Sequence, residues 1–258
     1  MPVVPKPAAT VLLVRDDPAP PPGRTPLQVF LQRRVAGMAF AGGMTVFPGG
    51  GVDPSDHLDV QAWVGPTPAE WGQRLGHPPE LAGALVKAAV RETYEECGVL
   101  LAGHGPVALP DGVRADLVAH RRALPDVLGE RALRADLMRA WSRWITPPPS
   151  PKRYDTAFLV AQVPEGQVAD AHTTEAVEAR WWHPAEALER WQAGEIALMA
   201  PTFTTLREID EHPDCAAALA AADLRDIEPV RPQLRRTGAE IDVVLPGDPD
   251  YRAAAHEV

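Results

Sequence analysis

The chain has 258 residues, of which 45% are apolar, and a formal net charge of −10. This length suffices for a full-sized hydrophobic core. The negative charge argues against general binding to nucleic acid or to an anionic membrane, because both depend on clustered Lys and Arg. No stretch approaches the roughly 20 apolar residues of a membrane helix. The two cysteines, Cys97 and Cys215, are too few for a disulfide framework, so we expect a reducing, cytoplasmic compartment.

The first third of the chain predicts two strands followed by a glycine-rich loop. Apolar and β-branched residues at 10–14 and 27–31 flank a proline-rich segment, which is typical of two strands joined by a loop. Glycines then recur over 42–51, a pattern that suits a backbone that turns tightly or approaches a ligand closely. We expect residues 53–79 to be a loop with one short helix.

A helix over 80–97 is the clearest prediction from the pattern of residues. Val86, Val90, Thr93 and Cys97 recur at intervals of three and four, which places them on one helix face. Gly98 follows as a stop signal. This helix is therefore expected to pack one stripe against a core.

The second half of the chain alternates between predicted helices and strands. A helical region is predicted over 113–144, broken near Pro125 and Gly129. The remaining predicted elements are strands at 157–163 and 179–182, helices at 184–193 and 201–212, and a hairpin with arms at 229–234 and 240–245. The hairpin could extend a sheet or pair with a second copy of the chain, so a homodimer is one expected partnership.

Three carboxylates share one side of the predicted helix. At 100° per residue, Glu92, Glu95 and Glu96 fall in a sector about 100° wide, beside the apolar stripe. Like charges this close repel, and a hard divalent cation would relieve that repulsion through carboxylate oxygens. The alternative is an ordinary solvated acidic face, which the acids alone do not exclude.

These acids combine with the glycine loop into a known pattern. Phe47-Pro48-Gly49-Gly50 followed by Arg91-Glu92-Thr93-Tyr94-Glu95-Glu96-Cys97-Gly98-Val99 resembles the signature of the Nudix hydrolases. The acid between the two halves corresponds to Asp56, which in that family helps to hold the arginine rather than the metal. Arg91 comes 35 residues after Asp56, so an insertion splits the signature and weakens this correspondence.

Other segments resemble the Nudix branch that includes the peroxisomal coenzyme A diphosphohydrolases of animals. They are Trp144-Ile145-Thr146-Pro147, the segment from Arg153 to Phe158, and the segment from Trp181 to Leu188. The resemblance implies an α/β fold of the Nudix type, an α/β/α sandwich with a mixed sheet, here with a helical insertion and a C-terminal hairpin. The implied hydrolase domain covers 1–222, with insertions at about 57–79 and 113–144, and an extension covers 223–258.

The resemblance also implies roles for particular residues. Glu92, Glu95 and Glu96 would bind Mg²⁺ or Mn²⁺, with the Gly49 carbonyl as a further ligand and Arg91 as the residue that orients the glutamates. Candidates for substrate binding are Arg33, Arg34, Arg153, Glu175 and Glu178, and the last two could instead accept a proton. Each of these five has a structural alternative as a solvated or ion-paired side chain.

The implied activity is metal-dependent hydrolysis of a phosphoanhydride in a nucleoside diphosphate conjugate. Coenzyme A or acyl-coenzyme A is the first expected substrate, and ADP-ribose or NADH is the second, because a fold and a metal site do not fix the leaving group. A third alternative is a non-catalytic sensor that binds a nucleotide metabolite. The expected partner is thus a small-molecule nucleotide conjugate, with neither nucleic acid nor membrane.

Overall fold

The computed structural model describes residues 3–37, 41–107, 109–148, 150–172, 176–237 and 240–245. The strands in these ranges are β1 (Lys6–Asp16), β2 (Leu27–Arg34), β3 (Thr45–Val46), β4 (Gly49–Gly51), β5 (Trp63–Val64), β6 (Leu133–Arg134), β7 (Met138–Ile145), β8 (Tyr154–Gln162), β9 (Ala176–Trp182), β10 (Pro229–Val230), β11 (Gln233–Thr237) and β12 (Glu240–Val244). The helices are α1 (Pro68–Leu75), α2 (Pro79–Cys97), α3 (Val113–Val118), α4 (Leu124–Leu128), α5 (Pro184–Gln192), α6 (Ala200–Ile209) and α7 (Cys215–Asp223), with short 3₁₀ turns at Pro54–His57 and Ala135–Leu137. Every helix in the described part is too short or too polar to cross a membrane.

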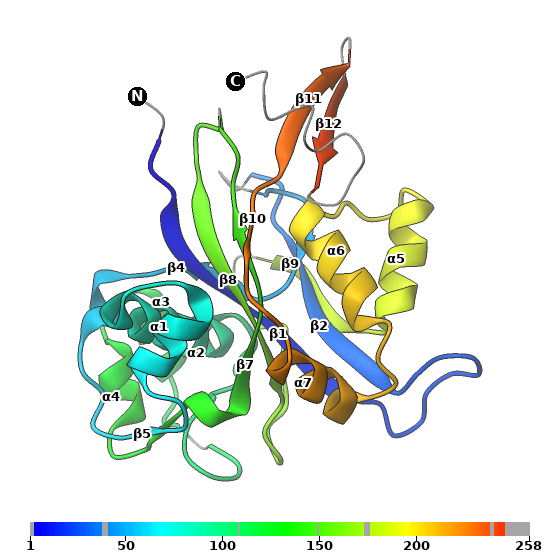
Figure 1. Ribbon diagram of the computed structural model, residues 1–258. Helices are drawn as coiled ribbons and strands as arrows, with labels where there is room; N and C mark the ends of the chain where they lie inside the picture. Colours follow the sequence, from blue (N-terminus) through cyan, green and yellow to red (C-terminus); the bar gives the residue numbers. More distant parts are fainter. Residues whose placement is uncertain are drawn as a thin grey trace.

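A mixed sheet forms the centre of the molecule (Figure 1). Its strand order is β10-β7-β8-β1-β2-β3, with β4 added to β1 and β9 added to β2. The pair β1 and β8 is parallel, whereas β1–β2 and β7–β8 are antiparallel. The long strand β1 pairs with β4 near its start and with β2 near its end, which brings the glycine loop onto the sheet.

Helices cover both faces of this sheet. Figure 1 shows α1 to α4 on one side and α5 to α7 on the other. Successive side chains of a strand point to opposite faces, and β1 follows this rule: Val11 and Leu13 belong to the core cluster of α2, whereas Leu12 and Val14 belong to the cluster of α7. Strands buried on both faces are apolar throughout, and the expected α/β/α sandwich is confirmed.

The signature helix agrees with its prediction. α2 begins at Pro79, where a proline suits the first helical turn, and ends at Cys97. Gly98 follows in the left-handed conformation with φ of 74°, which favours glycine. A Cβ at Gly98 would lie 2.8 Å from a carboxylate oxygen of Asp170. Burial raises the pKa of the Cys97 thiol to about 12, so this cysteine is a core residue.

The helical prediction over 113–144 is correct only for its first half. Residues 113–118 and 124–128 form α3 and α4, but Met138–Ile145 is strand β7, inside the main sheet between β10 and β8. The register of β7 shifts between Ala140 and Ser142, and a bulge of this kind interrupts the alternation of buried and exposed residues. The period-2 signal of a strand is therefore lost from the sequence.

Two further regions extend the predictions. Helix α7, which had not been predicted, spans the proposed domain boundary at residue 222 and packs against β7 and β8. The predicted tail hairpin is present as β11 and β12, but residues 229–230 form β10, a separate strand that pairs with β7. The division of the chain into 1–222 and 223–258 stays a prediction.

Candidate active site

A cavity of about 690 Å³ lies where the glycine loop, α2 and the C-terminal hairpin meet. This volume is within the range of about 300–1,000 Å³ that is usual for sites of small ligands. Its walls come from distant parts of the chain: Gly49–Gly51 of β4, the three glutamates of α2, residues 144–147 at the end of β7 and just beyond it, residues 198–202 just before and at the start of α6, and Leu234 and Val243 of the hairpin.

Arg91 organises the acidic end of this cavity through five hydrogen bonds. Its Nε and Nη2 donate to the two carboxylate oxygens of Asp56, each at 2.9 Å, and Nη2 also donates to the Gly51 carbonyl at 2.9 Å. Its Nη1 donates to Glu92 at 2.8 Å and to Glu95 at 3.2 Å. Burial works against the charge of Arg91, but these carboxylates more than offset it and raise its pKa above the ordinary value. Arg91 is thus a positioning residue for the carboxylates.

Asp56 spans the insertion that splits the signature. Its side chain has no exposed surface, and besides Arg91 it accepts a hydrogen bond from the Asp53 amide at 2.8 Å. That bond caps the short 3₁₀ turn at Pro54–His57. The contact expected between Asp56 and Arg91 is therefore present despite the 35-residue separation.

Glu92 lies against the glycine loop. A Cβ on Gly50 would come within 2.3 Å of its Oε1, so any other residue at position 50 would displace this carboxylate from its present position. Burial raises the pKa of Glu92 to about 7, with Arg91 acting against the shift and the charge of Glu95 adding to it. An acid held this way favours a positive ion nearby.

Glu96 is fixed by two donors to one oxygen. Gln32 of β2 donates to Oε2 at 2.6 Å, and the Gly49 amide donates to the same atom at 2.7 Å. A Cβ on Gly49 would lie 2.4 Å from the Ala9 carbonyl oxygen, so a side chain there would separate β4 from β1. Sequence reasoning missed Gln32, whose signal is a polar residue in the otherwise buried strand β2.

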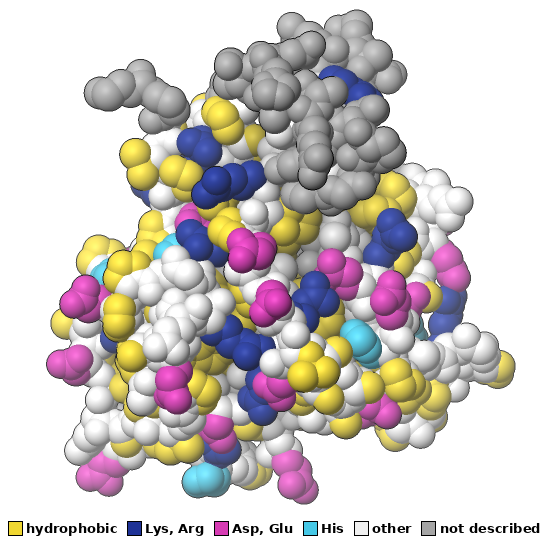
Figure 2. Space-filling model, viewed as in Figure 1, with side chains coloured by type: hydrophobic (Ala, Val, Ile, Leu, Met, Phe, Trp, Pro, Cys, Tyr) yellow, Lys and Arg dark blue, Asp and Glu magenta, His cyan; other side chains and the backbone are white. Residues whose placement is uncertain are grey.

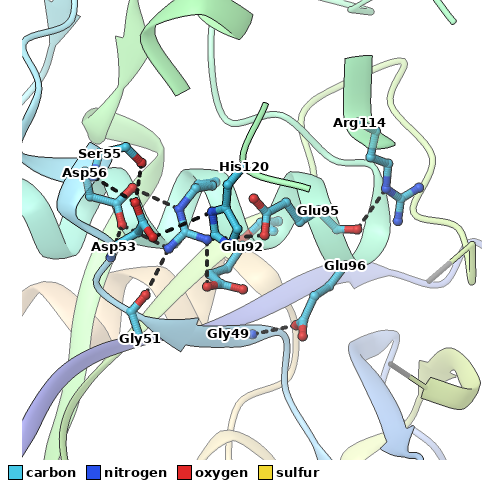
Figure 3. A network of polar contacts seen from close by, with 12 residues as sticks. Gly49, Gly51, Asp53, Ser55, Asp56, Glu92, Glu95, Glu96, Arg114 and His120 are labelled. Carbon is cyan, nitrogen blue, oxygen red and sulfur yellow. Dashed lines mark hydrogen bonds and ion pairs between the residues drawn. The ribbon is translucent and has the colours of Figure 1, made fainter. Parts of the chain in front are cut away.

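Arg114 and His120 bring the helical insertion to the same place, and sequence reasoning missed both. Arg114 donates to the backbone carbonyl of Glu95 at 2.9 Å (Figure 3). It also donates to Asp170 at 2.7 Å. His120 lines the cavity, with its Nδ1 3.6 Å from the Asp53 carboxylate. Its φ is 52°, an uncommon value for a residue other than glycine. The nearby arginine holds the pKa of Asp170 below its usual value, although burial acts in the opposite direction.

The five predicted substrate-binding residues are divided by the structure. Arg34 lines the cavity. Arg33 and Glu178 face each other on β2 and β9, with 3.7 Å between their charged groups. Arg153 donates to the carbonyls of Thr146 and Val3, each at 2.8 Å. Their placement therefore favours the structural alternative for Arg33, Glu178 and Arg153, while Glu175 lies outside the described residues.

The expected divalent cation would meet a set of carboxylate oxygens in this cavity. Among the described residues, no group of three or more His, Cys, Asp or Glu side chains is arranged so that it could hold a metal ion as the chain stands. Glu92 and Glu95 instead accept hydrogen bonds from Arg91, and Glu96 accepts them from Gln32 and the Gly49 amide. Their carboxylates are nevertheless hard oxygen donors that line one cavity, and burial and the charge of Glu95 raise the pKa of Glu92 even though Arg91 acts in the opposite direction. These properties fit Mg²⁺ or Mn²⁺. Gly49 lines the same wall.

Comparison with known proteins agrees with this geometry. A family model described as the NUDT19 Nudix domain matches residues 67–209. The human protein named acyl-coenzyme A diphosphatase NUDT19 is 27% identical over 310 residues, which cover 95% of this chain and 80% of that protein. A Caenorhabditis elegans protein named putative nudix hydrolase 7 is 28% identical, over 88% of this chain and 71% of that one.

A solved structure gives the same assignment. The Nudix hydrolase from Alicyclobacillus acidocaldarius superimposes with a TM-score of 0.68 and 27% identity, covering 88% of this chain and 99% of that one. The match to the family model also spans more than half of the chain and includes Arg91, Glu92, Glu95 and Glu96. The chain therefore belongs to the Nudix hydrolase family, in the group represented by the NUDT19 Nudix domain.

Proposed function

We propose that this chain hydrolyses the phosphoanhydride of coenzyme A or acyl-coenzyme A with Mg²⁺ or Mn²⁺ held by Glu92, Glu95 and Glu96. The observation that carries the proposal is a cavity that is lined both by three carboxylates and by apolar side chains such as Phe47, Leu198 and Leu234. The human relative named acyl-coenzyme A diphosphatase supports the choice of substrate. The intact carboxylates favour an enzyme over a non-catalytic sensor.

The chain's own residues have distinct tasks in this proposal. Glu92, Glu95 and Glu96 hold the cation, with the Gly49 carbonyl as the proposed further ligand. A bound divalent cation neutralises the diphosphate and makes a water molecule a better nucleophile. Arg91, itself neutralised by Asp56, keeps Glu92 and Glu95 in place. A carboxylate of the same cluster accepts the proton of the attacking water.

Binding of the phosphates is assigned to two further side chains of the cavity. Arg34 and His120 line the cavity with the carboxylates, and Arg side chains suit phosphate oxygens. On the face shown in Figure 2, the described Lys and Arg side chains are interspersed with Asp and Glu. This distribution supports a small anionic ligand in a pocket more than a nucleic-acid backbone along a basic surface.

Product analysis tests the proposal. The purified protein would be incubated with Mg²⁺ or Mn²⁺ and, separately, with coenzyme A, an acyl-coenzyme A, NADH and ADP-ribose. We expect 3′,5′-ADP together with phosphopantetheine or its acyl derivative. Cleavage of ADP-ribose or NADH alone would replace the substrate with the second candidate, and binding without turnover of any compound would favour the sensor.

Two further proposals concern the protein in its cell. Both cysteines are free and buried, which fits the cytoplasm as the proposed compartment. The homodimer also stays a proposal, and light scattering of the purified protein would test it by giving the molar mass in solution.

A further inference from the structure

The cavity continues from the carboxylates to an apolar wall made by two segments far apart in the chain. One segment is 198–202, at the start of α6, and the other is the C-terminal hairpin of β11 and β12. Neither segment contributes a charged side chain to the described wall, to which the hairpin region gives Pro232, Leu234 and Val243. A ligand that reaches both ends of the cavity therefore meets charge at one end and apolar surface at the other.

The hairpin presents this apolar surface through a cross-strand pair. Leu234 and Val243 are direct partners in the β11–β12 register, so both side chains lie on the same face of the hairpin. They keep 38% and 46% of their surface exposed, and both line the cavity. The next residue, Val244, points to the opposite face and is only 4% exposed. The hairpin is thus anchored through one face while the other borders the cavity.

The apolar wall belongs to the same cavity as the three glutamates. A ligand whose diphosphate lies at the glutamates can extend along the same cavity, without leaving it, to Leu234 and Val243. Burying an aliphatic chain there would remove both the chain and the two exposed side chains from water, which is favourable.

We propose that Leu234 and Val243, with the start of α6, form a subsite for the aliphatic acyl chain of an acyl-coenzyme A substrate. This inference rests on the proposed function, which it deepens: the hairpin makes the enzyme prefer acylated over free coenzyme A. Each buried methylene contributes about fourfold to a dissociation constant. Loss of about two such contacts therefore weakens binding of the acylated ligand by roughly tenfold or more.

The test compares binding of dodecanoyl-coenzyme A with binding of free coenzyme A. The variant is Leu234→Gln with Val243→Thr, which keeps side-chain size and removes apolar surface. Leu224→Gln is the matched control, because Leu224 is an apolar residue that is 88% exposed and does not line the cavity. All proteins carry Glu96→Gln to prevent turnover, and calorimetry without added divalent cation gives the dissociation constants.

Relative to the protein that carries Glu96→Gln alone, we expect the hairpin variant to bind dodecanoyl-coenzyme A about tenfold more weakly. Its dissociation constant for free coenzyme A should stay within twofold, and both constants should be unchanged in the Leu224→Gln control. Equal weakening of both ligands, or no change in either, would overturn the subsite. Circular dichroism and thermal unfolding check the fold, and the single variant Leu234→Ala replaces the double variant if the latter does not fold.

Turnover by the parent protein with Glu96 intact separates the two proposals. Absence of turnover combined with chain-selective loss of binding would refute the proposed hydrolysis and keep the subsite. Turnover of both compounds, with the same dissociation constants in parent and hairpin variant, would keep the hydrolysis and refute the subsite.

Discussion

Replacing Asp56 by Asn should destabilise the protein strongly, because Asp56 neutralises a buried arginine. Both side chains are at most 4% exposed, and two hydrogen bonds of 2.9 Å join them. Breaking a buried ion pair by removing one partner costs about 3–5 kcal/mol. Arg91 keeps Glu92 and Glu95 as partners, so we place Asp56→Asn at the lower end, about 3 kcal/mol.

This loss corresponds to a fall of roughly 6–12 °C in the midpoint of thermal unfolding for a domain of this size. Asp116→Asn is the matched control. Like Asp56, Asp116 forms ion pairs with arginine, but its partners, Arg121 and Arg122, lie on the surface. Exposed ion pairs contribute little, and its midpoint should hardly change. Calorimetric scans of the metal-free proteins measure both values. Equal midpoints for Asp56→Asn and Asp116→Asn would refute the reasoning that burial makes the Asp56–Arg91 pair important.

The remaining predictions concern the site itself. Glu96→Gln should lower kcat/KM for coenzyme A by roughly 100-fold or more, because substitution even of a residue that only supports a metal ligand lowers activity by about 10–100-fold. A variant with unchanged kcat/KM in a steady-state assay would contradict the mechanism. Burial and the charge of Glu95 raise the pKa of Glu92 from the ordinary value of 4.5 to about 7 in the folded, metal-free protein. Between these two pH values the folded protein therefore binds more protons than the unfolded chain. The contribution of Glu92 to the free energy of unfolding is thus complete below pH 4.5 and is lost as the pH rises through about 7. Unfolding midpoints measured against pH should show this decline in the unmodified protein and not in Glu92→Gln. Arg34→Ala should raise KM about tenfold through loss of a charge-assisted contact. Arg153→Ala should leave KM unchanged and lower the unfolding midpoint by about 2–4 °C. A raised KM in Arg153→Ala, with KM unchanged in Arg34→Ala, would restore Arg153 as a substrate-binding residue.

The strongest local pattern predicted helix α2 and its acidic cluster, whereas the fold was implied by the resemblance to the Nudix signature. The apolar stripe and Gly98 located α2 to within one residue, because the stripe, the stop signal and the core contacts all favour the same helix. The placement of Glu92, Glu95 and Glu96 on one side of α2 follows from helix geometry alone, and all three line the cavity.

The rest depended on contacts between distant residues. Gln32 donates to Glu96 across 64 positions of sequence, and nothing in the neighbourhood of Gln32 in the chain indicates that partner. The bulge in β7 hid a strand of the main sheet. The hairpin was predicted from its own pattern, but its contribution to the cavity wall depends on how the whole chain folds back.

The most direct test of the central claim is to locate the cation. Crystals of the protein grown with Mn²⁺ would be measured on both sides of the manganese absorption edge, so that anomalous scattering identifies the ion. We expect an anomalous peak within bonding distance of carboxylate oxygens of Glu92, Glu95 and Glu96. We expect this peak to be absent from crystals of Glu96→Gln. A peak elsewhere, or none at saturating Mn²⁺ while coenzyme A is still hydrolysed, would contradict the central claim.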